Sequence, residues 1–254
     1  MSLLTSLVSY WKFDESSGNA ADSYGVNTLT NNNTATYTTG IINNGTDLEA
    51  SSSQSFSIAD ASQVGLDLTG SFSASFWINP ETISGGANAV FSKFNQVGST
   101  GAYNLSTYTS GVDFRLFSSG SLTSKQWAYT FLTGTWYHLC IIYTASSGSA
   151  LLYINGVSQG VVTGLPNSID NSSVPFAIGG YSAGGGGFFD GIIDEVAIWS
   201  RELVSNEVTL LYSSGSGRAF STFGYDLFSD GTRPTASITN TSRQSSTITN
   251  QSKP

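Results

Sequence analysis

The amino-acid sequence predicts an all-β fold: a two-sheet antiparallel jelly-roll β-sandwich with one short C-terminal helix and an extended tail. Apolar and polar side chains alternate from Ser71 to Ile78, and similar short runs recur along the chain between turn residues. Asn155-Gly156 separates two of these runs, and this pair is typical of a type I′ hairpin turn, because both positions need positive φ. Within 188–212 the hydrophobic period changes from that of a strand to that of a helix. Many short strands with so little helix indicate two packed sheets.

The predicted strands are short and are separated by turn residues. They cover residues 8–13, 46–49, 55–58, 71–78, 89–94, 102–107, 112–117, 127–132, 137–143, 151–154, 157–162, 174–179 and 192–199. Residues 118–125 are predicted to form a polar turn. In the strand at 71–78, Trp77 points away from the Phe72 side, so its ring lines either a second buried face or an exposed one.

The one predicted helix follows the strand at 192–199. Its apolar residues take a helical spacing, at Leu203, Val204, Val208, Leu211 and Tyr212. Ser205 is a suitable N-cap, and Glu207 would lie in the first turn, where the helix dipole favours a negative charge. The preceding strand carries apolar side chains on both parities, so we expect both of its faces to be covered.

The chain is predicted to divide into three parts. Residues 1–213 form the sandwich, 214–231 form a linker that could dock as an extra strand, and 232–254 form a Ser/Thr/Asn-rich tail with a ten-residue repeat. The repeat cannot bury a core of its own, so it is either disordered or ordered by strand addition along another subunit. The second interpretation predicts an oligomer whose protein partners bind through the tail.

The composition limits the partners and the location of the protein. Charged residues are only 10% of the chain and the net charge is −8, so Ser, Thr, Asn and Gly must cover most of the surface. This is typical of secreted adhesins, carbohydrate-binding modules and virus particle proteins. The negative charge argues against nucleic acid or an anionic membrane as a partner. No apolar run reaches the ~20 residues of a membrane helix.

The N-terminus shows no Sec signal peptide, because it lacks a basic segment, a long apolar segment and a cleavage site. We expect an extracellular or virion-surface location. If residue 1 is the native start, the protein leaves its cell by another route, and a phage particle released by lysis is the simplest one.

Five motifs, in order along the chain, resemble those of the laminin-G-like, concanavalin A-like jelly-roll domains. They are VSYWKFDE at 8–15, LDLTGSFSASFWINP at 66–80, GTWYHLCIIY at 134–143, LLYING at 151–156 and FFDGIIDEVAIWSRELVSNE at 188–207. The ordered set covers roughly residues 7–213. It implies a lectin-like sandwich, and it leaves the last 40 or so residues unexplained.

The resemblance also implies a structural calcium ion near the opening loop and the closing strand, held by hard oxygen ligands. The matching residues are Asp22, Asn27 and Asp194. The alternative is that Asp22 caps a turn and Asp194 hydrogen-bonds the backbone at the strand start. Glu195 and Arg201 could form an ion pair beside it.

The sequence contains few side chains that could act as catalytic residues. A glycanase of this class needs two carboxylates about 5–10 Å apart, and Asp47 and Glu49 form the only same-face pair on a convincing strand, without a third acid at the expected step. His138 and Cys140 are the only histidine and the only cysteine. Both lie in an apolar strand, where we expect them to be packed, and nucleophilic triads are thereby excluded. The sequence predicts that the chain is not an enzyme, with a glycoside hydrolase or lyase as the alternative.

Glycan recognition combines an aromatic platform with planar polar side chains. The predicted glycan-binding residues are Tyr103, Arg115, Trp127, Tyr129 and Tyr181, and Tyr108 is a further available aromatic. The alternative for each is packing in the core or at its rim. The sequence therefore predicts a non-catalytic, surface-displayed module that binds a cell-surface or extracellular glycan, carried on a phage virion as a decoration or fibre-type subunit. Two further alternatives are a purely architectural assembly protein and a calcium-stabilised carbohydrate-binding module of a secreted bacterial enzyme or adhesin.

Overall fold

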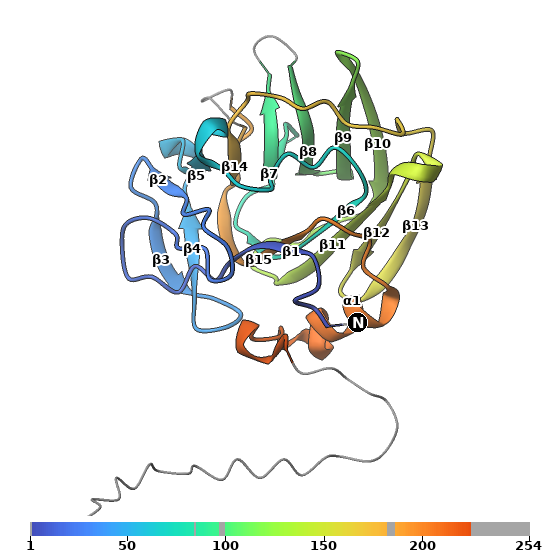
Figure 1. Cartoon of the computed structure of the whole chain (residues 1–254). Coiled ribbons are helices and arrows are strands. Elements are labelled where there is room, and N and C mark those ends of the chain that lie inside the picture. Colours follow the sequence, from blue (N-terminus) through green and yellow to red (C-terminus); the bar gives the residue numbers. More distant parts are fainter. Residues whose placement is uncertain (1, 84, 97–99, 182–185, 225–254) are drawn as a thin grey trace, which may run out of the picture.

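The computed structural model describes residues 2–83, 85–96, 100–181 and 186–224, and these form two antiparallel sheets packed face to face (Figure 1). The first sheet has the order β13 (Val157–Thr163), β12 (Ser149–Ile154), β11 (Tyr137–Thr144), β6 (Phe72–Pro80), β15 (Gly191–Trp199), β4 (Asn44–Leu48) and β3 (Thr36–Thr39), with β1 (Leu7–Trp11) also paired to β15. The second has the order β10 (Ser121–Ala128), β9 (Gly111–Ser118), β8 (Thr100–Tyr108), β7 (Asn88–Asn95), β14 (Phe176–Ile178), β5 (Ser55–Ile58) and β2 (Thr30–Asn32). The predicted jelly-roll sandwich is confirmed.

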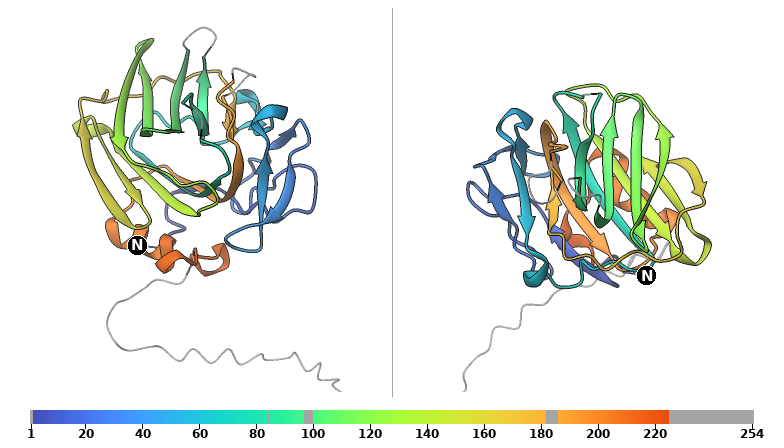
Figure 2. Two further views of the ribbon diagram at one scale, coloured as in Figure 1. Left: turned by 180° about the vertical axis from the view of Figure 1, so that it is seen from behind. Right: turned by 90° about the horizontal axis from the view of Figure 1, so that it is seen from above.

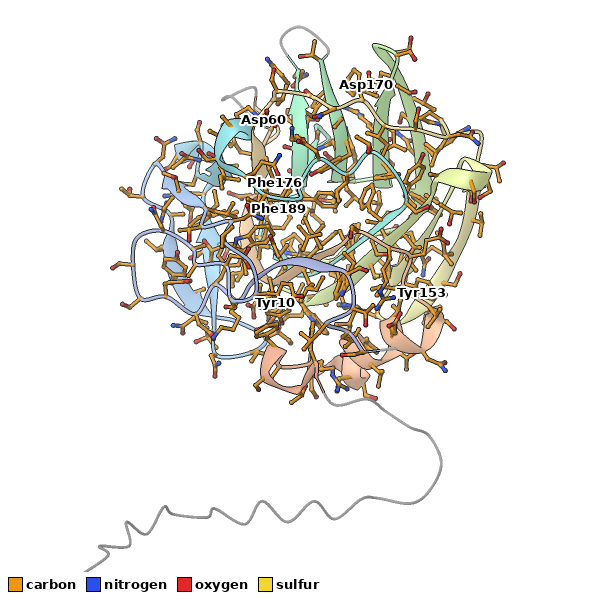
Figure 3. All side chains as sticks on the ribbon, viewed as in Figure 1. Tyr10, Asp60, Tyr153, Asp170, Phe176 and Phe189 are labelled. Atoms are coloured by element: carbon orange, nitrogen blue, oxygen red, sulfur yellow. The ribbon has the colours of Figure 1, made fainter. Side chains whose placement is uncertain are left out.

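The main core lies between the two sheets. Phe176 of β14 and Phe189, just before β15, are fully buried there (Figure 3). Trp11 stacks on Phe176 with ring centroids 5.4 Å apart, which ties the first strand to the opposite sheet. His138 and Cys140 of β11 are also fully buried, as their apolar surroundings predict. The Asn155-Gly156 turn has φ values of 52° and 73°, which confirms the predicted type of hairpin.

A second apolar cluster covers the outer face of the first sheet. It joins the N-terminal segment, β1 and β15 to α1 (Ser205–Tyr212), through residues such as Leu3, Tyr10, Trp199 and Val208. Trp77 lies under this layer and stacks on Tyr212, with ring centroids 5.9 Å apart and planes inclined by 23°. The outer side of β6 is therefore a second buried face, and β15 is covered on both sides as its sequence predicts.

The start of α1 differs from the prediction. Val204 is the N-cap and Ser205 is already the first helical residue. A valine side chain cannot accept a hydrogen bond, and the Glu207 carboxylate instead accepts the Val204 N–H at 2.9 Å. Arg201 binds both oxygens of Glu207, at 2.6 and 2.8 Å, so it pairs with this residue and not with Glu195. The predicted Glu195–Arg201 ion pair is wrong, because the helix start supplies a better placed carboxylate.

Three strands were predicted wrongly or not at all. β10 occupies Ser121–Ala128, most of which was expected to be a polar turn, and 129–132 continues without strand structure. β2 and β3 were not predicted. All three lie at sheet edges and carry mostly polar, solvent-facing side chains, so they lack the apolar alternation that marks a half-buried strand.

Residues 214–224 fold back onto the sandwich in short 3₁₀ turns, not as a strand (Figure 2). Phe223 is buried against Tyr10, with ring centroids 5.1 Å apart, and Phe220 packs beside it. The sandwich thus extends past residue 213 to at least Phe223. The rest of the predicted linker, 225–231, and the repeat tail, 232–254, lie outside the described residues. Among the residues described, no helix combines the length and apolar character needed to cross a bilayer.

Candidate functional site

Asp22, the first predicted calcium ligand, holds the loop that follows β1. Its Oδ1 accepts the backbone N–H groups of Tyr10, Tyr24 and Gly25 at 2.8–3.0 Å, and its Oδ2 accepts that of Asn27 at 3.0 Å. Four N–H dipoles therefore converge on this carboxylate and already compensate its charge. A cation beside the same oxygens would meet the positive ends of those dipoles.

Asn27 and Asp194 are bonded in a similar way. The Asn27 amide donates to Ser9 and to the Val64 carbonyl and accepts the Val64 N–H, all within 2.8 Å. Asp194 accepts the N–H groups of Ile41 and Ile42 on Oδ2 and that of Glu195 on Oδ1. Burial raises the pKa of Asp194, and these three donors oppose that rise. The oxygens of all three residues are thus already engaged by hydrogen-bond donors, which argues against a shared calcium ion, and the calcium site stays a prediction.

Asp22→Asn tests this reading. The amide keeps the three bonds to Oδ1 and loses only the bond to the Asn27 N–H, so the fold is expected to persist. We expect any shift in melting temperature between EDTA and excess calcium to be equal in the wild-type protein and in the variant, measured by differential scanning fluorimetry. A calcium-dependent rise in the wild-type protein that disappears in Asp22→Asn would restore the predicted site.

Three other carboxylates lie close together at the ends of β4 and β6 in the first sheet. Asp47, Glu49 and Glu81 each place an oxygen within 4.8 Å of the others. Burial, and next the charge of Asp190, raise the pKa of Asp47, and burial together with these neighbouring acids raises the pKa of Glu81. The sequence suggested the first two as a pair, but Glu81 joins them from a segment far along the chain.

The predicted glycan-binding residues separate into two groups. Tyr103 is fully buried between the sheets and donates to the Leu66 carbonyl at 2.7 Å, so it is a core residue. Tyr129 is half-buried at the rim, where it packs on Phe131 and Tyr137. Trp127 packs in the main core at the end of β10, whereas Arg115 and Tyr181 lie together on the outer face of β8 and β9.

Arg115 is the centre of this group. Its side chain points away from the core, and its Nε donates to Asp113 at 2.6 Å, one Nη donates to the Tyr108 hydroxyl at 2.7 Å and the other lies 3.4 Å from the Tyr181 hydroxyl. Burial lowers the pKa of Arg115, but Asp113, Tyr108 and Tyr181 raise it by more. The net pKa is raised, so the guanidinium stays charged. Within the described part of the chain three of its five N–H groups are used, which leaves two that can donate to a ligand.

A hollow of about 330 Å³ adjoins Arg115 at the ends of these strands. We call it the β8–β10 hollow; it is lined by Tyr108, Ser110, Gly111, Val112, Gln126, Trp127 and Ala128. Tyr108 connects it to Arg115. Burial raises the pKa of Tyr108, so its hydroxyl stays protonated.

Two features shape the walls of the hollow. Gly111 has φ +139°, and a Cβ there would lie 1.9 Å from the Trp127 carbonyl oxygen, so only glycine permits this approach of β9 to β10. The Trp127 indole donates to the Gly160 carbonyl at 2.8 Å and is only 5% exposed. It supplies a fixed apolar wall, while Gln126 of the same strand is exposed. The sequence analysis missed Gln126 and Ser110 because both fall between predicted elements: Gln126 between the turn at 118–125 and the strand at 127–132, and Ser110 between the strands at 102–107 and 112–117.

Solved structures of similar fold include domain 4 of AbnA, an extracellular arabinanase from Geobacillus stearothermophilus, in complex with arabinotriose (22% identity, TM-score 0.62, covering 84% of this chain and 98% of that one). The binding domain of Paraclostridial Mosquitocidal Protein 1 (18%, TM-score 0.65, 84% and 53%) and that of botulinum neurotoxin serotype D (15%, TM-score 0.64, 84% and 52%) are also similar. This chain spans about half of those two toxin domains. At these identities the likeness concerns the fold.

Sequence comparison points the same way. No curated protein sequence matches the chain. Residues 50–209 match the Laminin_G_3 family model, described as the concanavalin A-like lectin/glucanases superfamily, and this segment runs from the end of β4 into α1. It covers more than half of the chain and includes most strands of both sheets, the β8–β10 hollow and the closing strand. The chain therefore belongs to the concanavalin A-like lectin/glucanase superfamily.

Proposed function

We propose that the protein is a non-catalytic binding module that recognises a glycan at the β8–β10 hollow. The observation that carries the proposal is that an aromatic side chain, an exposed amide and a hydroxyl line one concave surface, beside a charged guanidinium that is bonded to the Tyr108 hydroxyl. Tyr108 and the edge of Trp127 offer apolar surface to the C–H groups of a sugar ring. Gln126, Ser110 and Arg115 offer the directional hydrogen bonds that distinguish one hydroxyl pattern from another.

The charge at the site favours a neutral sugar. Arg115 is paired with Asp113, which is 1% exposed and also accepts a bond from Ser124, so the pair has no net charge. An acidic sugar would have to compete with Asp113 for the guanidinium. The structure of AbnA domain 4 with arabinotriose, and the toxin binding domains, support a binding role on this fold.

The non-catalytic part of the proposal has separate support. The single histidine is buried, and burial lowers its pKa to about 3, so it is a poor general base near neutral pH. The acidic cluster at Asp47 belongs to the other sheet, away from the proposed site. Display outside the cell or on a virion stays part of the proposal, supported by the low charge content and the extracellular origin of AbnA.

Gln126→Ala and Tyr108→Ala test the site. After a glycan array identifies a ligand, we expect each variant to weaken binding by roughly 5–150-fold in isothermal titration calorimetry, because each removes about 1–3 kcal/mol of contact. Thr123→Ala, on the same strand but outside the hollow, is the matched control and should bind like the wild-type protein. Trp127→Ala is less informative, because this buried side chain also supports the core.

The outcomes separate the alternatives. Selective binding that is weakened by Gln126→Ala and Tyr108→Ala, and not by Thr123→Ala, supports the proposal. A flat array, with the protein shown to be folded, contradicts it and favours an architectural role. Release of shorter saccharides on incubation would contradict the non-catalytic part alone.

A further inference from the structure

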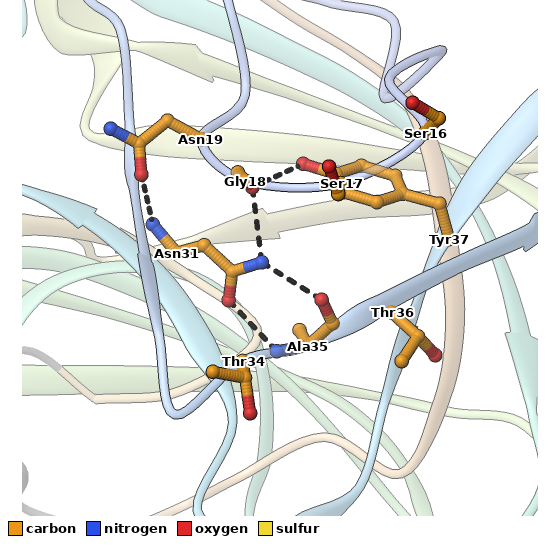
Figure 4. Close-up of a pocket in the computed structure, with 9 residues that line it drawn as sticks. All are labelled: Ser16, Ser17, Gly18, Asn19, Asn31, Thr34, Ala35, Thr36 and Tyr37. Atoms are coloured by element: carbon orange, nitrogen blue, oxygen red, sulfur yellow. Dashed lines mark hydrogen bonds between the residues drawn. The ribbon is translucent and has the colours of Figure 1, made fainter.

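A second hollow lies at the opposite edge of the second sheet, between the 16–19 loop, β2 and β3. It has a volume of about 410 Å³ and is lined by nine residues, shown in Figure 4. This size falls within the usual range for small-ligand sites. We call it the β2–β3 hollow.

The walls of the β2–β3 hollow are fixed by hydrogen bonds. The Asn31 amide donates to the carbonyls of Gly18 and Ala35 at 3.0 and 2.8 Å and accepts the Ala35 N–H at 2.8 Å. Tyr37 donates its hydroxyl to Gly18 at 2.9 Å (Figure 4). Burial, and next the Glu15 carboxylate, raise the pKa of Tyr37, so it stays a donor. The loop and the strand are held in place without a ligand, which lowers the entropic cost of binding one.

The rim of the hollow contains a strained residue. Thr34 has φ +56°, a left-handed conformation that is rare for a β-branched side chain and costs about 1–2 kcal/mol. Gln54 holds it by donating to the carbonyls of Asn33 and Thr34, and Asn33 is itself bonded to Ser53. Strain that is held by surrounding bonds is concentrated at ligand-binding sites in proteins.

The groups that face the hollow define the chemistry of its ligand. Within the described part of the chain, the hydroxyls of Ser16, Ser17, Thr34 and Thr36 and the Nδ2 of Asn19 have no hydrogen-bond partner. No charged side chain lines the hollow, and Ala35 and the Tyr37 ring give it an apolar floor. Many neutral donors and acceptors around an apolar patch match a neutral saccharide.

We infer that the β2–β3 hollow is a second saccharide site, and that the protein binds a polysaccharide at two points. The choice of ligand class rests on the proposed function. β2 and β10 are the two edges of the same sheet, six strand spacings apart, or roughly 29 Å along the sheet. Two sites this far apart cannot share one short oligosaccharide, but a long chain could engage both, and linked binding of this kind strengthens apparent affinity by up to 10²–10⁴-fold.

The test is an NMR titration of the ¹⁵N-labelled protein with a panel of neutral trisaccharides that includes arabinotriose. We expect two separate groups of shifted amides, one around Gly111 and one around Gly18 and Ala35. Thr36→Trp fills the β2–β3 hollow from an exposed strand position and should abolish only the second group. Thr39→Trp, exposed on the same strand outside the hollow, is the matched control and should keep both.

Polymer binding and a strain-relieving variant give independent readouts. With a long chain of the recognised sugar, Thr36→Trp should lose at least tenfold in apparent affinity while its affinity for the trisaccharide at the β8–β10 hollow is unchanged. Thr34→Asn removes the Thr34 hydroxyl that faces the hollow, so it should weaken binding at the second site. Asparagine accepts the left-handed conformation more readily, so the melting temperature should not fall. Shifts around Gly111 alone would overturn this inference and leave the proposed function standing. No shifts with any sugar would overturn both.

Discussion

Glu195→Gln is expected to stabilise the protein at pH 8 by on the order of 3 kcal/mol and to raise its melting temperature by roughly 5–10 °C. Glu195 lies at the irregularity of β15 between Asp194 and Ala197, with φ +50°. It is 5% exposed, and among the residues that the structure describes neither of its carboxylate oxygens has a hydrogen-bond partner. An unpaired charge in such a place is costly, and glutamine has the same shape without the charge.

The sign of the pH dependence follows from burial. Desolvation raises the pKa of Glu195 from 4.5 to about 8. The folded protein therefore holds a proton that the unfolded chain releases near pH 4.5. The stability associated with this proton is fully present below pH 4.5 and is lost as the pH rises to about 8. A shift of this size corresponds to on the order of 5 kcal/mol, so the wild-type protein should lose stability across that window. Glu195→Gln should lose less, and its remaining loss is that of Asp194, whose pKa burial also raises to about 8.

The measurement is urea denaturation at several pH values from 5 to 9. Asp194→Asn is the neighbouring control: burial raises the pKa of Asp194 to about 8 as well, but its carboxylate accepts three backbone N–H groups, so the substitution should stabilise the protein less at pH 8 than Glu195→Gln does. Parallel stability curves for the wild-type protein and Glu195→Gln over this pH range would show that Glu195 finds a partner or water, and would contradict the prediction.

The two sheets could be predicted from the sequence because the strands of the core have a recognisable apolar pattern. β6, β9 and β11 alternate or run apolar, since each presses a face onto the opposite sheet. β10 was misplaced because an edge strand with a solvent-facing side needs no apolar pattern, and Gln126 fell between the predicted turn and the predicted strand. The local pattern of apolar and polar residues indicates which side chains are buried. It indicates strand pairing only where the paired strand is also buried.

The site was harder to predict than the fold. The sequence cannot distinguish an aspartate that accepts backbone N–H groups from an aspartate that binds calcium. In the structure, Asp22 accepts backbone N–H groups. Arg115 and Tyr181 are in contact although they are 66 residues apart in the sequence, and a local sequence pattern cannot predict a contact of this kind. Tyr103 and Tyr181 look alike as candidates, yet one faces the core and the other the outer side, because the parity of each is set by its neighbours in the sheet.

Removing both acids around Lys93, as Asp60→Asn with Asp67→Asn, is expected to destabilise the protein by about 3–5 kcal/mol. Lys93 of β7 is fully buried, and its Nζ lies 2.5 Å from Asp60 and 2.8 Å from Asp67. It also donates to the Ser172 carbonyl. Without the two carboxylates, an ammonium group that water cannot reach would have no compensating charge.

Lys93→Met is expected to cost less than half as much, although it removes the same ion pairs. The side chains of Asp60 and Asp67 are 27% and 33% exposed, so water can solvate them when the lysine is absent. Methionine also fills most of the buried volume. The triple variant should then recover most of the loss seen with the double asparagine variant. Guanidinium chloride denaturation of the four proteins measures this cycle. Equal losses of stability from the acid and the lysine substitutions would mean that the pairs contribute mainly through Coulomb attraction. A larger loss from the acid substitutions, as expected, would show that the carboxylates mainly compensate the desolvation of Lys93.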